Sequence, residues 1–339
     1  MKPIGPLKRS FWITTITAFA VSMVGAHAIA AFYLPQAILK PPFSLLIRSY
    51  VAGYPRGHTD HYMFRYGIFG FGERIRSADI LILGTSHPQL GLSAAQLSQQ
   101  LSTQLGRPIK AFNMGLGFGD GMGFANAVLT ANGVHDKGLI VDLYQPWGGG
   151  MSEYARGAVD ADVAIAYAKT CLIWADFVRD WVFDGIFPRL TLAPSSPKRT
   201  DRFLGLALFR DWRTGDVVDI WWPDRGLIYQ NPPPEMMHGL VEGPPPTGLP
   251  NDGISLPEDS ARLLEERKLA AILTLLPYQG YDLGKADGIA RRYGLSLTTV
   301  SPDGLTFLDT NHLTADGRGL ATKRLAAELP AGWMRREAR

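Results

Sequence analysis

A serine, an aspartate and a histidine stand in this chain where they can act as one catalytic group. Ser86 follows the apolar run 80–83 after a Gly-Thr pair, and Asp309 precedes His312 by three residues near the far end. A nucleophilic serine needs a base within hydrogen-bond distance and an acid that orients the base. We therefore predict a triad of Ser86, Asp309 and His312. In the structural alternative, Ser86 caps a turn and Asp309 caps the closing helix.

A second group of residues can bind the reacting carbonyl and the substrate. Asn113 and Gly115 follow another short apolar run, and a glycine N–H and an asparagine amide can both stabilise an oxyanion. The alternative for Asn113 is a turn residue that satisfies its own backbone. His87, Trp221 and Trp222 are candidate substrate contacts, although tryptophan clusters also serve as packing.

The sequence gives no reason to expect a metal or an organic cofactor. His58, Asp60 and His61 lie close together but lack a third or fourth ligand with metal-site spacing, so loop hydrogen bonding is the simpler role. The glycines between 115 and 123 are not followed by a Lys-Ser/Thr pair and do not match a dinucleotide fingerprint. We predict no cofactor.

The elements that position these residues form an α/β pattern. Short apolar runs typical of buried parallel strands alternate with stretches of helical periodicity, and Ser93 and Thr314 are suitable N-caps. Ligands of doubly wound sheets bind beyond the carboxyl ends of the strands, where Ser86, Asn113 and Asp309 all fall. The expected strands are 79–83, 109–112, 139–143, 270–276 and 297–300, and the expected helices are 93–105, 124–131, 284–293 and 314–329.

A long insertion is expected between the third and fourth strands. The segment 146–262 is far longer than one crossover helix requires. We expect helix over 153–187 and then irregular surface chain, which together act as a lid or an acceptor platform. The segment 35–77, with several prolines, is expected to be a stalk that packs on the domain 78–330, and 331–339 a tail.

The N-terminus predicts a membrane anchor. Residues 11–34 carry no charged side chain, and about 20 apolar residues span a bilayer. Cations in the preceding tail, 1–10, stay cytoplasmic by the positive-inside tendency. We expect one pass through the inner (cytoplasmic) membrane, contact with membrane lipid through 11–34, and a periplasmic or extracellular catalytic domain. A cleaved signal peptide is the alternative, since 26–30 offers small residues at cleavage spacing.

Composition narrows the remaining classes. The chain has 339 residues, 46% of them hydrophobic, which is enough for a large core. Its 34 basic and 31 acidic residues are scattered, without the basic clusters that follow a phosphate backbone, so nucleic acid is not an expected partner. Cys171 is the only cysteine and does not identify a redox compartment.

The chain resembles the SGNH, or GDSL, hydrolase superfamily over about 78–145 and 265–329. Residues 84–86 resemble the block that carries the nucleophile, 113–115 the block that contributes an oxyanion donor, and 309–312 the block that carries acid and base. Two features depart from the pattern. Residues 142–145 stand where the family has Gly-x-Asn-Asp, and no aspartate lies between the glycine and serine of the first block.

The resemblance implies a flavodoxin-like parallel sheet and serine chemistry on acyl groups. The departures are similar to branches that O-acylate envelope polymers, although in the alginate O-acetylation branch the acid and base precede the serine. We therefore expect an O-acyltransferase that moves an acyl group, such as acetyl, onto a cell-envelope or exopolysaccharide hydroxyl. The implied partners are a membrane-bound O-acyltransferase as donor and a polysaccharide acceptor. The alternatives are a GDSL-type esterase of carbohydrates or lipids and a non-catalytic assembly scaffold.

Overall fold

The chain divides into two units, residues 1–47 and residues 48–339. The computed structural model describes residues 43–54, 57–117, 120–145, 150–181, 206–222, 225–232, 234–237, 253–267, 269–278, 281–330 and 332–333. In the first unit this leaves η1 (Phe43–Ile47), a 3-10 helix. The predicted anchor, 11–34, lies outside the described residues. Within the described part of the chain, no helix combines the length and apolarity that a membrane crossing requires.

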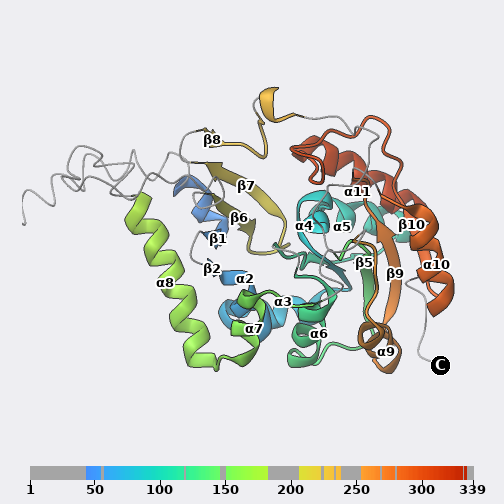
Figure 1. Cartoon of the computed structure of the whole chain (residues 1–339), viewed down its shortest axis with the longest axis horizontal. Coiled ribbons are helices and arrows are strands. Elements are labelled where there is room, and N and C mark those ends of the chain that lie inside the picture. The colour runs from blue at the N-terminus through green and yellow to red at the C-terminus, as the bar shows by residue number, and fades with distance from the viewer. Residues whose placement is uncertain are drawn as a thin grey trace, which may run out of the picture. The chain divides into compact units, whose positions relative to one another are not determined.

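The second unit is a mixed α/β structure that contains one parallel and one antiparallel sheet (Figure 1). The parallel sheet has the order β10-β9-β5-β3-β4, and every neighbouring pair in it is parallel. Its strands lie within about two residues of the predicted ones. They are β3 (Ile80–Leu83), β4 (Ala111–Asn113), β5 (Gly138–Asp142), β9 (Ala270–Leu275) and β10 (Ser296–Thr299).

Helices cover both faces of the parallel sheet because successive side chains of a strand point to opposite faces. Ile80 and Ile82 pack in one apolar cluster with α5 (Ala94–Leu105) and α11 (Ala315–Glu328). Leu81 and Leu83 pack in another. The helices that contribute to this second cluster include α3 (Phe71–Ser77), α6 (Met122–Ala131), α9 (Glu258–Glu266) and α10 (Leu283–Tyr293).

The antiparallel sheet differs from the sequence expectation. Its order is β2-β1-β6-β7-β8, so it joins residues expected in a stalk to residues expected in irregular chain. Every residue of β1 is buried, which gives this segment the drive to pair with the distant β6. Pairing over such a sequence separation leaves no local pattern. The strands are β1 (Ser49–Tyr54), β2 (Gly57–His58), β6 (Ala207–Asp211), β7 (Val217–Trp222) and β8 (Gly226–Leu227).

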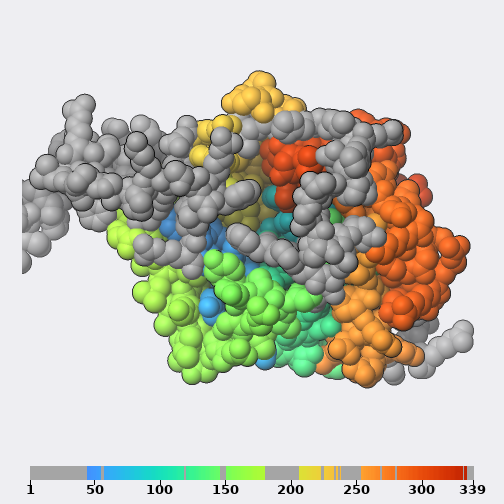
Figure 2. Space-filling model, viewed as in Figure 1, coloured from blue at the N-terminus to red at the C-terminus, as the bar shows by residue number. Residues whose placement is uncertain are grey.

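The remaining elements surround the two sheets. Ser93 and Thr314 cap α5 and α11 as predicted, because each hydroxyl accepts a backbone N–H of the first helical turn. In the space-filling view the surface of α6 lies between those of α7 and α9 (Figure 2). The other helices are α2 (Thr59–Tyr66), η2 (Ile68–Gly70), α4 (Ser86–Gly91), α7 (Glu153–Asp160), α8 (Val163–Trp181) and η4 (Pro234–Met236).

Candidate active site

The structure brings Ser86, His312 and Asp309 together. Ser86 Oγ lies 2.8 Å from His312 Nε2, and His312 Nδ1 lies 2.8 Å from Asp309 Oδ2 and 3.0 Å from Oδ1. An ionised carboxylate can only accept hydrogen bonds, so Nδ1 is the nitrogen that carries the proton in the neutral ring. Nε2 is then an acceptor for the Ser86 hydroxyl. This connectivity is that of a serine nucleophile with its general base.

Ser86 is presented by a sharp turn from β3 into α4. Gly84 has φ +143°, and a Cβ at this position would lie 2.7 Å from Pro88 Cγ, so only glycine fits. Thr85 is the N-cap of α4, with its hydroxyl accepting the His87 N–H at 3.4 Å, and Ser86 is the first helical residue. The turn therefore holds Ser86 just beyond the carboxyl end of β3.

One short loop carries both His312 and Asp309. Asp309 Oδ1 accepts the backbone N–H groups of Asn311 and His312, each at 2.8 Å. The loop is closed by the Leu308 N–H donating to the His312 carbonyl at 2.7 Å and by a bridge between Phe307 and Leu313. Because this local network fixes the loop, the chain itself sets the orientation of the imidazole.

The site is open to solvent, and its acid is held in the charged form. The His312 side chain is 24% exposed and that of Asp309 is 54% exposed. Partial burial opposes the charge on Asp309, but the charge of His312 and the hydrogen bonds from His312 and the Asn311 N–H outweigh it. The pKa of Asp309 therefore lies well below its usual range, and the carboxylate stays ionised at neutral pH.

The predicted oxyanion donors, Asn113 and Gly115, lie beside α4 but are engaged with protein acceptors. The Asn113 amide donates to the carbonyls of Pro88 and Leu92, both at 2.9 Å, and the Gly115 N–H donates to Asn113 Oδ1 at 2.9 Å. A Cβ on Gly115 would lie 2.5 Å from the Gln89 backbone nitrogen. In this geometry both residues stabilise the position of α4, Asn113 by hydrogen bonds and Gly115 by its close approach to the helix backbone.

A buried arginine that the sequence did not predict donates hydrogen bonds to the loop that contains Asn113 and Gly115. Arg210, on β6, is fully buried, and its guanidinium donates to the carbonyls of Asn113 and Gly115 and to Asp60 Oδ2, the last at 2.6 Å. Asp60 also accepts the Tyr50 hydroxyl at 2.7 Å. Asp60, considered above for a metal, is thus the counter-ion of Arg210. No motif or spacing in the inserted segment singles out this arginine.

His87, the residue after Ser86, is buried beside the His312 ring. Its ring stacks on Tyr144 with centroids 3.8 Å apart and lies 5.9 Å from the His312 ring, and the residue is 2% exposed. Neither ring nitrogen has a hydrogen-bond partner among the described residues, and Nδ1 lies 3.9 Å from the equally buried Asp142 Oδ2. Burial, then the charge of His312, lowers the pKa of His87 well below its usual value. Burial raises that of Asp142 to about 8.

The two candidate tryptophans lie on β7 and are half-buried. Trp222 packs against an apolar cluster that includes Leu90 of α4 and Leu308, the residue before Asp309. Trp221 makes an edge contact with Phe177 of α8. Trp222 therefore packs against residues adjacent to the triad, while Trp221 packs against α8. Their predicted contact with substrate stays a prediction.

A second group of the same three residue types lies elsewhere in the unit, and we call it the Ser152 cluster. His61 Nε2 lies 2.8 Å from Asp120 Oδ2, and the Ser152 hydroxyl donates to the same oxygen at 2.6 Å. The side chains of His61 and Asp120 are fully buried. The His58 ring lies 5.5 Å from that of His61, and burial, then His61, lowers the pKa of His58 to about 3.

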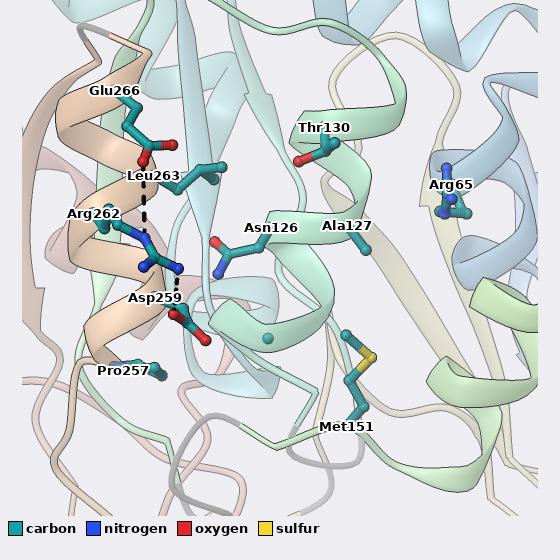
Figure 3. A pocket seen from close by; sticks show the side chains of 11 residues that line it. Arg65, Asn126, Ala127, Thr130, Met151, Pro257, Asp259, Arg262, Leu263 and Glu266 are labelled. Carbon is teal, nitrogen blue, oxygen red and sulfur yellow. Dashed lines mark hydrogen bonds and ion pairs between the residues drawn. The ribbon is translucent and has the colours of Figure 1, made fainter.

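An open groove of about 480 Å³ runs between α6 and α9, and it contains none of the triad residues (Figure 3). Arg262 of α9 is paired there with Asp259 at 2.7 Å and with Glu266 at 3.8 Å. Asn126 of α6 points toward α9 and donates to Ser260 Oγ at 3.0 Å. The charges of Arg262, Asp259 and Glu266 in the groove are paired with one another, and the described residues that line the groove include no serine–histidine pair.

A scan against protein-family models, a search of curated proteins and a search of solved structures found no match to this chain.

Proposed function

We propose that this chain is an SGNH-like serine acyltransferase that works through an acyl-Ser86 intermediate. The observation that carries the proposal is the contact of 2.8 Å between Ser86 Oγ and His312 Nε2, with Asp309 at 2.8 Å on the other ring nitrogen. A serine paired in this way is activated for attack on a carbonyl.

The proposed step begins when His312 Nε2 takes the Ser86 proton as Oγ bonds to the acyl carbon. The carbonyl electron pair moves onto its oxygen and then re-forms the double bond as the leaving oxygen departs with the proton from His312. Asp309 keeps the imidazole oriented and stabilises its positive charge. The acceptor hydroxyl then repeats the sequence and receives the acyl group from Ser86.

The topology supports the SGNH-like, flavodoxin-like assignment. In chain order the parallel strands run 2-1-3-4-5 across the sheet, the order of flavodoxin-like folds, and such folds bind ligands beyond the carboxyl ends of their strands. Ser86 follows the carboxyl end of β3. Residues 146–262 would be an insertion in this fold, although part of that segment lies outside the described residues.

The proposed acceptor is a sugar hydroxyl of an envelope polysaccharide. This part rests on the predicted anchor at 11–34, which would hold the domain beside envelope glycans and beside a membrane-bound acyl donor. The second candidate is an esterase that transfers the acyl group to water. The 24% exposure of His312 favours it, because water has access to the base.

Intact-mass spectrometry of the full chain in detergent tests the proposal. A fluorophosphonate should add once to the wild type and not to Ser86→Ala, while Ser152→Ala, the matched serine of the second cluster, should still be labelled. An activated acyl ester supplied with an oligosaccharide then separates the acceptors, since a transferase yields acylated sugar and an esterase yields free acid. A folded wild type without any adduct would overturn the proposal and favour the scaffold alternative.

A further inference from the structure

The site has fewer free oxyanion donors than acyl transfer requires. The N–H groups of Asn113 and Gly115 are engaged with protein acceptors at 2.9 Å. The Ser86 N–H, the first of α4, has no acceptor among the described residues and is free for an oxyanion. Preorganised hydrogen-bond donors aimed at the developing charge are usually the largest single catalytic contribution. A further donor must come from another element.

Tyr144 is the candidate for that donor because its ring contacts the residue next to Ser86. It follows β5 by two residues, and its ring is stacked on His87 at 3.8 Å with an interplanar angle of 5°. His87 is the neighbour of Ser86 in α4, and its ring contacts that of His312. The His87 ring therefore contacts both the Tyr144 ring and the ring of the proposed base, His312.

The Tyr144 ring is fixed by its surroundings. Tyr278 packs on it with centroids 4.7 Å apart, and a Cβ on Gly253 would lie 2.8 Å from its Cε2 atom. The backbone is held as well, by a bridge to Ile254 and by the Gln145 N–H donating to the Gly253 carbonyl. A phenol locked in this way does not have to reorganise during the reaction.

The Tyr144 hydroxyl is unused and keeps its proton. Buried Tyr50 and Tyr229 donate to Asp60 and to the Leu90 carbonyl, whereas the hydroxyl of Tyr144 has no partner among the described residues. Burial, then the charges of Asp142 and Asp309, raises its pKa to about 12. The neighbouring His87 is not an alternative donor, because both its ring nitrogens are shielded from solvent, while the Tyr144 oxygen is not among such shielded atoms.

We infer that the Tyr144 hydroxyl donates a hydrogen bond to the oxyanion formed on Ser86 acylation, together with the Ser86 N–H. The inference rests on the proposed acyl-transfer function. The phenol keeps its proton throughout, so its contribution is electrostatic and grows as the carbonyl oxygen becomes charged. Tyr144 would thus be a catalytic residue, because it touches the reacting oxygen.

The test is Tyr144→Phe, which deletes the donor and keeps the ring on His87. We expect the rate constant for fluorophosphonate labelling of Ser86 to fall about 10²-fold. With an acyl ester, kcat should fall by a similar factor while KM changes little, and the thermal unfolding midpoint should stay near that of the wild type. Tyr278→Phe is the matched control, since Tyr278 packs on the same histidine.

Two results would overturn the inference. One is a Tyr144→Phe variant that is labelled as fast as the wild type. The other is an equal loss in Tyr144→Phe and Tyr278→Phe, which would show that losing either tyrosine hydroxyl beside His87 slows labelling and that Tyr144 has no particular role at the oxyanion. A wild type that is never labelled at Ser86 would instead overturn the proposed function, and the role of Tyr144 with it.

Discussion

Two groups of serine, histidine and aspartate in this unit differ in connectivity and in exposure. In the Ser86 triad the hydroxyl contacts the histidine, and the base is 24% exposed. In the Ser152 cluster the hydroxyl donates to Asp120 instead, and both His61 and Asp120 are fully buried. A hydroxyl that donates its hydrogen bond to a carboxylate is not paired with an imidazole that could act as its base. The residue types alone therefore do not make a nucleophile.

The Ser152 cluster has a structural explanation. The Ser152 hydroxyl accepts the Ala155 N–H as the N-cap of α7, and its own backbone N–H donates to Asp120 at 2.6 Å. Burial raises the pKa of Asp120, but the hydrogen bond and charge of His61 and the hydrogen bonds of Ser152 outweigh it, so the pKa is lowered. A buried and fully paired carboxylate fixes the start of a helix, whereas a half-exposed one can serve a reaction.

The largest difference between the two groups should appear in the labelling rate when the histidine of each group is replaced by glutamine. His312→Gln removes the base that contacts Ser86, so we expect fluorophosphonate labelling to slow by about 10⁴-fold or more. His61→Gln should leave the labelling rate unchanged, because His61 has no contact with Ser86. Intact-mass spectrometry of samples quenched at successive times measures the labelling rate of both variants. Equal losses in the two variants would contradict the division between the groups.

When the aspartate of each group is replaced by asparagine, the larger loss should be one of stability and should occur in the Ser152 cluster. Asp120→Asn disrupts a buried hydrogen-bond network, because the carboxylate accepts from Ser152 and contacts His61, and we expect it to lower the free energy of unfolding by about 3 kcal/mol. Asp309→Asn should cost at most about 1 kcal/mol, because its carboxylate is half exposed and screened by solvent. Urea unfolding of both variants gives the comparison. A larger stability loss in Asp309→Asn would contradict this prediction, because the Ser86 triad would then contribute more to stability than the Ser152 cluster.

A smaller effect is expected in the pH dependence of stability. The pKa of His58 is about 3 in the folded chain, below the ordinary value of about 6.5. Between these values the unfolded state binds a proton and the folded state does not, so stability falls as the pH falls through this window, by at most about 1.4 kcal/mol per pH unit. His87, whose pKa is also lowered, adds a slope of the same sign.

His58→Gln should therefore flatten the dependence between pH 6.5 and pH 4 without abolishing it, because His87 remains. The control is His135→Gln, a change at an exposed histidine. Chemical unfolding at successive pH values on the three proteins measures the slopes. If His58→Gln and the wild type have parallel curves, His58 does not resist protonation in the folded chain.

The sequence predicted the elements whose signals are local. Runs such as 80–83 are short, apolar and bounded by turn residues, and they became strands of the parallel sheet. Ser93 and Thr314 cap their helices because a cap needs only the three residues that follow it. Ser86, Asp309 and His312 could be nominated for the same reason, since each follows a strand in a pattern that can be read along the chain.

Only the tertiary structure decided which partner each polar group has. The antiparallel sheet pairs β1 with β6, and Arg210 reaches loops nearly a hundred residues away along the chain; neither leaves a local pattern. From its residue type, Asn113 could donate to an oxyanion. In the fold its amide donates instead to two backbone carbonyls, those of Pro88 in α4 and of Leu92 directly after it. The order of elements follows from local periodicity and turn chemistry. Hydrogen-bond partners and exposure follow from which surfaces are buried together, because a buried polar group must find its partner wherever the fold puts one.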